Sequence, residues 1–213
     1  MNENADVNPR KRPVQQRSWH TVEAILEAAT RILEEQGIGS FNTNAIADRA
    51  GVGVASLYEY FPCKEAVAAE LVLRAHLTLV AALRDTLTET EGFPFERAMR
   101  SMIRRVVACE CARPGLARVL ELEEEILPKT MELLAAEAEI YRLNMSLLAR
   151  YLDLPALKQE DIEIAAFDTH CMVRAILDAS LDASPNRMES IEERLCRAVI
   201  GYLQPLLRRE RAA

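Results

Sequence analysis

Apolar residues recur along this chain at intervals of three and four positions, the spacing that places them on one face of an α-helix. The first stripe consists of Val22, Ile25, Leu26, Ala29, Ile32 and Leu33. We expect its helix to start at Ser18 as the N-cap and to end at Gly37. Residues 1–17 lack this spacing and contain Pro9, Pro13 and several cations, so they are predicted to form a flexible basic arm.

Two short helices and a long one are predicted next. One runs over 44–50, with Thr43 as its cap and Gly51 at its end. Another runs over 54–61, because helical geometry is disfavoured for the residue that precedes Pro62. The long, largely apolar helix is expected over 64–88.

The rest of the chain shows helical spacing in five more segments. They are 95–112, 116–125, 129–152, 161–182 and 188–207. We find no alternation of apolar and polar residues with the period of a strand. Alanine, leucine, glutamate and arginine, which are strong helix formers, dominate the 213 residues. The fold class is therefore predicted to be all-α, with about nine helices.

Charge is distributed unevenly along the chain. The net charge is −7, yet residues 10–64 carry seven cations against six anions, so the remainder accounts for −8. An acidic protein with a locally basic front can bind DNA, because only the face near the phosphates needs to be positive. We expect no segment to span a membrane and see no apolar signal-peptide core, so a cytoplasmic location is predicted.

The most informative stretch is 41–67, which reads FNTNAIADRAGVGVASLYEYFPCKEAV. Two short helices joined by a tight turn at Gly51 can present the second helix as a rigid rod. Such a rod fits the major groove of B-DNA, which is about 12 Å wide. Ala47 and Ala50 are small where the two helices must cross closely. The stretch therefore predicts a helix-turn-helix over 43–61.

The residues expected to contact DNA lie in and around this second helix. Its first turn faces base edges, and hydroxyl groups suit phosphate oxygens. Lys64 and Thr43 open helices, where free N–H groups and the positive helix end favour an anion. The predicted set is Arg17, Thr43, Gly53, Val54, Ala55, Ser56, Tyr58, Tyr60 and Lys64.

These residues resemble the TetR-type (TetR/AcrR) family of transcriptional regulators. The resemblance rests on T-x-x-I-A-x-x-A-G-V at 43–52 and S-L-Y-x-Y-F-P-x-K-E at 56–65, at the expected distance after an amphipathic helix. About 60 residues match the family in layout, and the rest only as a helical domain of suitable length. Gly53 and Cys63 depart from the family, which often has serine at the first position and asparagine or serine at the second. Both should weaken helix capping, by up to about 1 kcal/mol each.

The resemblance implies a division of labour along the chain. Residues 18–78 would form the DNA-binding domain, and 79–213 a domain that binds an effector and dimerises. It implies a homodimer on a palindromic operator of double-stranded DNA, packed through the last two helices. The expected interface residues are Thr169, Met172, Val173, Ile176, Leu195, Val199, Tyr202 and Leu206. An effector would shift the fourth helix and lower operator affinity, although activation by the same binding mode stays open.

The effector pocket is the least determined part of this interpretation. A pocket in such a domain should be mostly apolar with a few polar anchors, which favours a hydrophobic small molecule. The candidate lining residues are Met99, Met102, Tyr141, Met145, Phe167 and His170. Methionines at helical spacing belong more often to a simple core, and for His170 packing is favoured over contact with a ligand.

Several bland alternatives accompany these assignments. Tyr58 and Tyr60 could pack against neighbouring residues instead of contacting phosphate, and Lys64 could be a solvated charge. The cations of the arm at 1–17 could only increase solubility, or they could contact a phosphate or an adjacent minor groove. Cys109 and Cys111 are expected to be structural thiols, with a redox or metal switch as the alternative. We predict no catalytic residue, metal or cofactor. The rival functions are a protein-binding helical adaptor and a small all-α enzyme.

Overall fold

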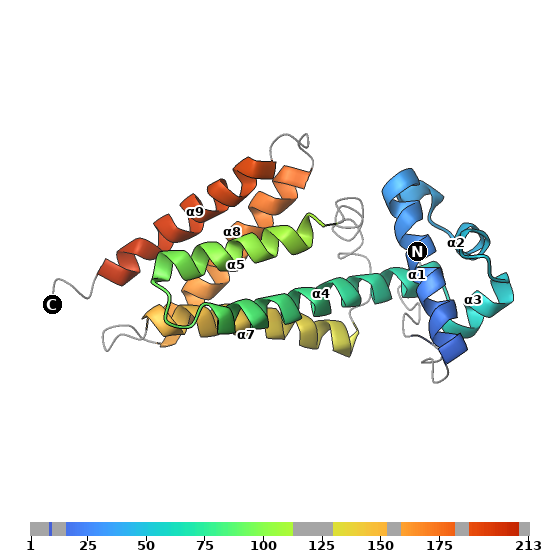
Figure 1. Ribbon diagram of the computed structural model, residues 1–213, viewed down its shortest axis with the longest axis horizontal. Coiled ribbons are helices and arrows are strands. Elements are labelled where there is room, and N and C mark those ends of the chain that lie inside the picture. Colours follow the sequence, from blue (N-terminus) through green and yellow to red (C-terminus); the bar gives the residue numbers. More distant parts are fainter. Residues whose placement is uncertain (1–8, 10–15, 113–129, 153–158, 182–187, 209–213) are drawn as a thin grey trace. The chain divides into compact units, whose positions relative to one another are not determined.

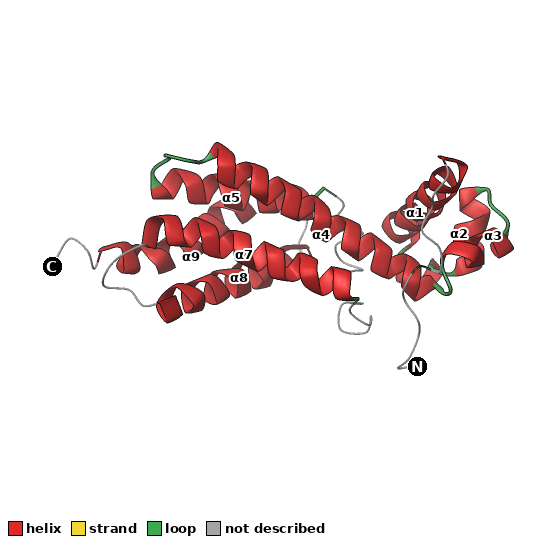
Figure 2. Cartoon of the chain, turned by 90° about the horizontal axis from the view of Figure 1, so that it is seen from below, coloured by secondary structure: helices red, strands yellow, loops and turns green. Residues whose placement is uncertain are grey.

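The computed structural model describes residues 9, 16–112, 130–152, 159–181 and 188–208, and in these ranges the regular structure is entirely helical (Figures 1 and 2). This confirms the all-α class. The helix predicted over 116–125 and the arm cations Arg10, Lys11 and Arg12 lie outside the described residues. The described chain divides into two units. We call residues 16–75 with 130–134 the head unit, and 76–112, 135–152, 159–181 and 188–208 the body unit.

The head unit is built from short helices around one longer one. Its elements are α1 (Gln16–Gln36), the 3-10 turn η1 (Ile38–Ser40), α2 (Thr43–Ala50), α3 (Val54–Tyr60), the first part of α4 (Lys64–Glu89) and the first turn of α7 (Met131–Leu152). The helix α1 begins before the predicted start, so Ser18 lies inside it and the proposed N-cap is wrong. Gly37, with φ of 73°, ends this helix as predicted.

A single apolar core holds the head unit together. The predicted stripe of α1 points into it, together with side chains from α2, α3 and α4. The largest fully buried members are Ile25, Ile32, Ile46, Leu57 and Phe61. Leu133, from α7, joins the same core, which the sequence did not indicate.

The body unit is a bundle of five helical segments. It contains the rest of α4 and α7, together with α5 (Phe95–Glu110), α8 (Gln159–Leu181) and α9 (Met188–Arg208). α9 packs against both α8 and α5. Its core is rich in leucine, and the fully buried members include Leu143, Leu147, Leu148, Leu152, Ile191, Leu195 and Leu203.

Polar contacts tie α7 to α4 and to the turn that follows α4 within the body unit. Arg84 forms an ion pair with Glu139 at 2.7 Å. Arg150 donates to the backbone carbonyl of Leu87 at 2.8 Å. The Tyr151 hydroxyl donates to the carbonyl of Phe93 at 2.7 Å. The two hydrogen bonds satisfy backbone carbonyl groups near the end of α4 and in the turn after it, and all three contacts hold α7 beside α4.

α4 departs from one sequence expectation. Among the described helices it is long and apolar enough, by length and composition, to cross a membrane. Half of that apolar window is buried inside the protein, with Val67, Leu71 and Val72 in the head core. Long apolar core helices of folded proteins have the same composition, so this feature carries no further weight.

Candidate nucleic-acid interface

The first helix of the helix-turn-helix has a defined cap at each end. The Asn42 side chain accepts a hydrogen bond from the N–H of Ala45 at 3.0 Å. Asn42 is therefore the N-cap, and Thr43, predicted as the cap, is the first helical residue. Gly51 adopts φ of 67° and ψ of 29°, and the N–H of Val52 donates to the carbonyl of Ala47 at 3.0 Å. The left-handed conformation of Gly51 ends α2 and forms the tight turn that leads into α3.

The second helix of the motif depends on the core beneath it. α3 has only seven residues, and its N-cap Gly53 offers no side-chain bond. A helix this short is unstable alone, so its structure depends on packing. Leu57 is fully buried and Tyr60 is 7% exposed, both in the head core. The Tyr60 ring therefore takes the packing alternative rather than lying on the exposed face.

The opposite side of α3 is open to solvent. Gly53, Val54 and Ala55 are exposed, Ser56 is half-buried, and Tyr58 is 39% exposed. Four of these residues are small, so the backbone of the first turn is accessible to a neighbouring molecule. The sequence-predicted face of α3 therefore lies at the surface.

One contact joins the two helices at this surface. The hydroxyl groups of Thr43 and Tyr58 lie 3.1 Å apart and share a hydrogen bond. Both residues were candidates from the sequence, but their pairing was not predicted, because they are fifteen positions apart. The bond places two hydroxyl groups at one point of the surface, where either could turn outward to a phosphate oxygen.

The start of α4 supplies the cation of this region. Lys64 is the first residue of the helix and is half-buried. Burial raises the pKa of the neighbouring Cys63 thiol, while the backbone N–H groups of Ala66 and Glu65 that face its sulfur act in the opposite direction. The thiol thus occupies the place where the family often has a capping hydroxyl or amide.

Ion pairs also join neighbouring helices of the head unit. Arg49 of α2 pairs with Glu35 of α1 at 2.7 Å. Arg74 of α4 bonds both Glu23, at 2.7 Å, and Glu70, at 2.8 Å. Sequence reasoning counted Arg49 simply as a local cation, and the structure places its charge on a neighbouring carboxylate. The backbone of Arg17 is helical, and its side chain lies outside the described part.

The predicted effector-pocket residues differ in how far they are buried. Met99 and Met102 are buried core residues, and Tyr141 and Met145 are half-buried. Phe167 is 60% exposed, and His170 is exposed. These last two side chains are open to solvent in the single chain, and their assignment to an effector pocket stays a prediction.

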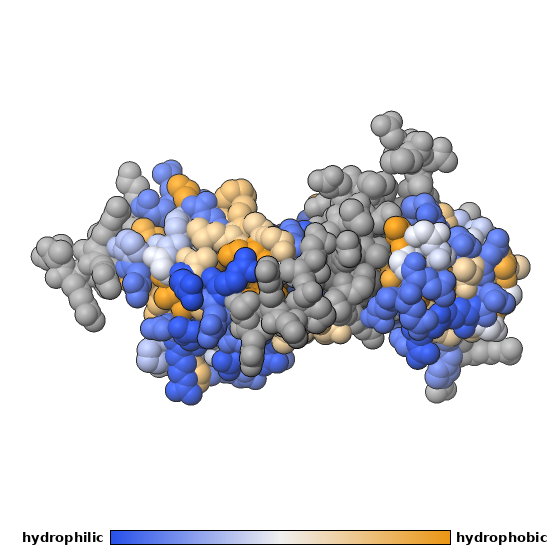
Figure 3. All heavy atoms as spheres, turned by 90° about the horizontal axis from the view of Figure 1, so that it is seen from above, coloured by the Kyte–Doolittle hydropathy of each residue, from blue (hydrophilic) through white to orange (hydrophobic). Residues whose placement is uncertain are grey.

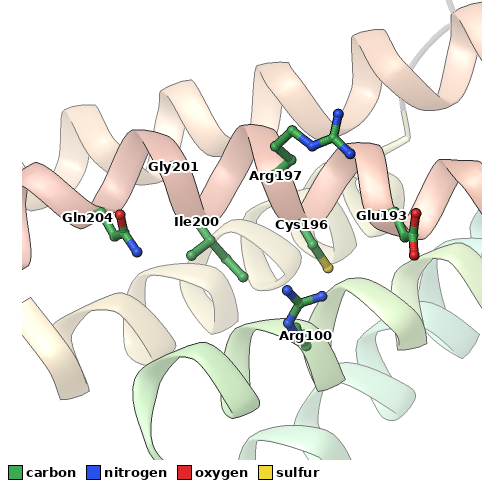
Figure 4. A pocket seen from close by; sticks show the side chains of 7 residues that line it. All are labelled: Arg100, Glu193, Cys196, Arg197, Ile200, Gly201 and Gln204. Carbon is green, nitrogen blue, oxygen red and sulfur yellow. The ribbon is translucent and has the colours of Figure 1, made fainter.

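A hollow of about 410 Å³ lies instead between α5 and α9 (Figure 4). Its lining residues are Arg100, Glu193, Cys196, Arg197, Ile200, Gly201 and Gln204. None was predicted, and the lining is dominated by charged and polar groups. Arg100 is held by Glu96 at 3.1 Å. The hollow therefore differs from the mostly apolar pocket expected for the effector.

The predicted dimer residues mostly face the core of their own body unit. Leu195 and Val199 are 0% and 1% exposed, and Thr169 is 3% exposed with its hydroxyl bonded to the carbonyl of Ala165. These three side chains pack within their own unit, and their assignment to a dimer interface stays a prediction. Met172, Val173, Ile176, Tyr202 and Leu206 are half-buried. Periodicity alone cannot tell a stripe that faces its own core from one that faces a partner.

The cysteines are thiols in varied surroundings. Cys196 is buried, and Cys109 and Cys111 are half-buried. Burial raises the pKa of all three thiols, which disfavours the reactive thiolate. Among the described residues, no group of three or more histidine, cysteine, aspartate or glutamate side chains could hold a metal ion.

Comparison with known proteins identifies the family. The profile "Bacterial regulatory proteins, tetR family" matches residues 25–71, and "Tetracyclin repressor-like, C-terminal domain" matches 94–203, more than half of the chain. The chain therefore belongs to the TetR family of bacterial transcriptional regulators. It is a helix-turn-helix regulator by family, as its head unit indicates.

Individual relatives are more distant. The chain is 28% identical over 95 residues to the uncharacterized HTH-type transcriptional regulator YobS of Bacillus subtilis (strain 168), covering 45% of this chain and 48% of YobS. It thus spans about half the length of that curated relative.

Solved structures share the fold over most of the chain. A TetR-family regulator from Mesorhizobium loti MAFF303099 is similar with a TM-score of 0.69 and 20% identity, over 89% of this chain and 98% of that one. Thermus thermophilus FadR, solved with lauroyl-CoA, has a TM-score of 0.60 and 19% identity, over 84% and 93%.

Proposed function

We propose that this protein is a homodimeric, cytoplasmic repressor that binds a palindromic DNA operator and is released by a hydrophobic small molecule. The observation that carries the proposal is the exposed face of α3 beside the paired hydroxyl groups of Thr43 and Tyr58. An α-helix with its side chains is about 10–12 Å in diameter, which fits a major groove about 12 Å wide.

The residues at this face divide into two roles. Val54 and Ala55 present methyl groups that suit the methyl group of thymine, and Ser56 can bond to either kind of base edge. Thr43, Tyr58 and Lys64 would contact phosphates, with the positive end of α4 adding to the charge of Lys64. Because Gly53 has no side chain, its backbone could lie close to the DNA. Tyr60 is not part of this proposed interface, because its ring lies in the core.

The proposed dimer uses a different stripe from the one the sequence suggested. Apolar residues of α8 are exposed at positions i, i+3, i+7, i+11 and i+15, namely Ile164, Phe167, Cys171, Ala175 and Ala179. These spacings keep them within one face of the helix. On the face of the body unit visible in Figure 3, hydrophobic side chains gather beside hydrophilic ones. An exposed apolar stripe on a folded protein is typical of an interface.

We propose a hydrophobic effector because the body core consists mainly of leucine and isoleucine side chains. Lauroyl-CoA, which is bound to Thermus thermophilus FadR, is a suitable first probe. Lauroyl-CoA should lower operator affinity and free coenzyme A should not. An equal effect of both would contradict an effector site that recognises the apolar chain.

The DNA-binding function is tested by selecting bound duplexes from a random pool. The wild-type protein should enrich a palindrome, and the Tyr58→Ala/Lys64→Ala variant should not. Tyr60→Phe is the matched control, because it changes a tyrosine two positions away that lies in the core. Enrichment of no duplex by the wild-type protein over a range of salt would favour the adaptor alternative, and turnover of a substrate would favour the enzyme.

A further inference from the structure

The helix α3 carries a single charged side chain, Glu59, and that charge is negative. Glu59 is exposed, as are Val54, Ala55 and Tyr58 of the same helix, whereas Leu57 is buried in the head core. In the described part of the chain, no ion pair or hydrogen bond neutralises the Glu59 carboxylate. The helix proposed to enter the major groove therefore brings an uncompensated negative charge to the DNA.

Glu59 lies on the outer side of α3. It follows Ala55 by four residues and Ser56 by three, so these three side chains share one face of the helix. Leu57 and Tyr60, the two buried residues of α3, point toward the core. The Cα–Cβ bond in a helix tilts toward the N-terminus, which carries the Glu59 side chain back over the turn that holds Ala55. Four residues of helix rise about 6 Å, and the side chain of Ala55 ends at its methyl group, so the carboxylate has room above the turn proposed to contact bases.

An acidic side chain in a DNA groove is repelled by the phosphates and by most groups on the base edges. Guanine N7 and O6, adenine N7 and thymine O4 are hydrogen-bond acceptors, as an ionised carboxylate is. The N4 amino group of cytosine is a donor with no acceptor beside it on the same base, whereas the amino group of adenine lies next to N7. A carboxylate in the major groove is therefore best matched by cytosine.

We propose that Glu59 is a specificity-determining residue that accepts a hydrogen bond from the N4 amino group of one cytosine in each half of the operator. The inference rests on the proposed function, because it needs α3 in the major groove. The hydrogen bond offsets the repulsion at cytosine and leaves it uncompensated at the other three bases. Glu59 thus selects a sequence in two ways, by binding the correct base and by weakening binding to the others.

The test is a selection of bound duplexes from a random pool by the wild type and by Glu59→Gln. Glutamine has nearly the same size and helix propensity, but its amide both donates and accepts and suits the N6 and N7 atoms of adenine. The wild type should enrich cytosine at one position in each half of its palindrome. Glu59→Gln should enrich adenine there and leave the other positions unchanged. Glu34→Gln, which removes an exposed carboxylate from α1, should enrich the same palindrome as the wild type.

A titration separates base recognition from the effect of charge alone. It compares two duplexes that differ only in having cytosine or adenine at that position of each half. The wild type should bind the cytosine duplex about fivefold or more tightly, the low end of discrimination by a good base contact. In Glu59→Gln this ratio of affinities should be reversed, and Glu59→Ala should bind both duplexes equally. The loss of a negative charge by itself strengthens binding to both duplexes and leaves their ratio unchanged.

Each outcome bears on the inference. If the wild type enriches a palindrome and Glu59→Gln keeps the wild-type base preference at every position, Glu59 acts only through its charge; the inference is overturned and the proposed function stands. Loss of all binding by both Glu59 variants also overturns it, because a residue that recognises one base should change the preferred sequence and not abolish recognition. If the wild type enriches no duplex, the proposed function and this inference fail together.

Discussion

Gly51→Ala tests the turn on which the orientation of α3 depends. Gly51 has φ of 67°, a conformation that costs an L-residue with a Cβ atom about 1–2 kcal/mol. An added Cβ atom would meet no other atom within 4 Å, so the expected cost is conformational and contains no steric clash. We therefore expect the free energy of unfolding of the head unit to fall by about 1–2 kcal/mol.

The fluorescence of Trp19 provides the assay, because it is the chain's single tryptophan and lies in α1 of the head unit. Urea unfolding followed by this signal gives the difference between the wild type and the variant. Gly53→Ser is the matched control: its φ is −66°, an added Cβ atom has space, and serine is a good N-cap. We expect that variant to be as stable as the wild type, or more stable by a few tenths of a kcal/mol.

Two results would refute this reasoning. If Gly51→Ala leaves the unfolding curve unchanged, the turn does not need the left-handed conformation. If it lowers the free energy of unfolding by much more than about 3 kcal/mol, the added methyl group meets packed atoms. At the expected cost the head unit stays folded, because domains are stable by about 5–15 kcal/mol, and operator affinity should change little.

Three further substitutions test packing, titration and assembly. Leu57→Ala should destabilise the head unit by about 2–5 kcal/mol in the same urea assay, because it opens a cavity beneath α3, and equal stability would contradict that packing. Burial and the Asp168 carboxylate, which accepts the hydroxyl's hydrogen bond, raise the pKa of Tyr202 from 10 to about 12. The protonated Tyr202 hydroxyl therefore stabilises the folded state below pH 10, and this stabilisation is lost as pH rises toward 12. In Tyr202→Phe the free energy of unfolding should fall less steeply between pH 10 and pH 12 than in the wild type. Phe167→Asp should convert dimers to monomers in sedimentation experiments, Leu77→Asp should not, and a persistent Phe167→Asp dimer would exclude the α8 stripe.

The sequence predicted most of the head unit because local rules determine it. The stripe of α1, the glycine that ends α2 and the proline that follows α3 each act within a few residues. The small exposed residues of α3 and the start of α4 at Lys64 follow from the same rules. The choice of Thr43 as N-cap was wrong by one residue, because Asn42 and Thr43 are both good caps and only the backbone decides between them.

The body unit was harder to predict because its helices are apolar on more than one face. Periodicity indicated an apolar stripe on α9 but could not tell whether Leu195 and Val199 face the core or a second copy. The exposed stripe of α8 begins at Ile164, and periodicity does not separate it from the apolar inner face of the same helix. The insertion of Leu133 into the head core is a contact between segments far apart in the sequence, which no local pattern records.

The central claim is that the face of α3 recognises a DNA sequence. The most direct measurement is a titration of the wild-type protein with the enriched duplex and with a scrambled duplex of the same composition, at several salt concentrations. The account predicts that the wild-type protein binds the enriched duplex at least about 10³-fold more tightly than the scrambled one. It also predicts that Lys64→Ala reduces the slope of log affinity against log salt concentration by about 1, the value for one lost phosphate contact. Equal affinity for the two duplexes at every salt concentration would contradict it.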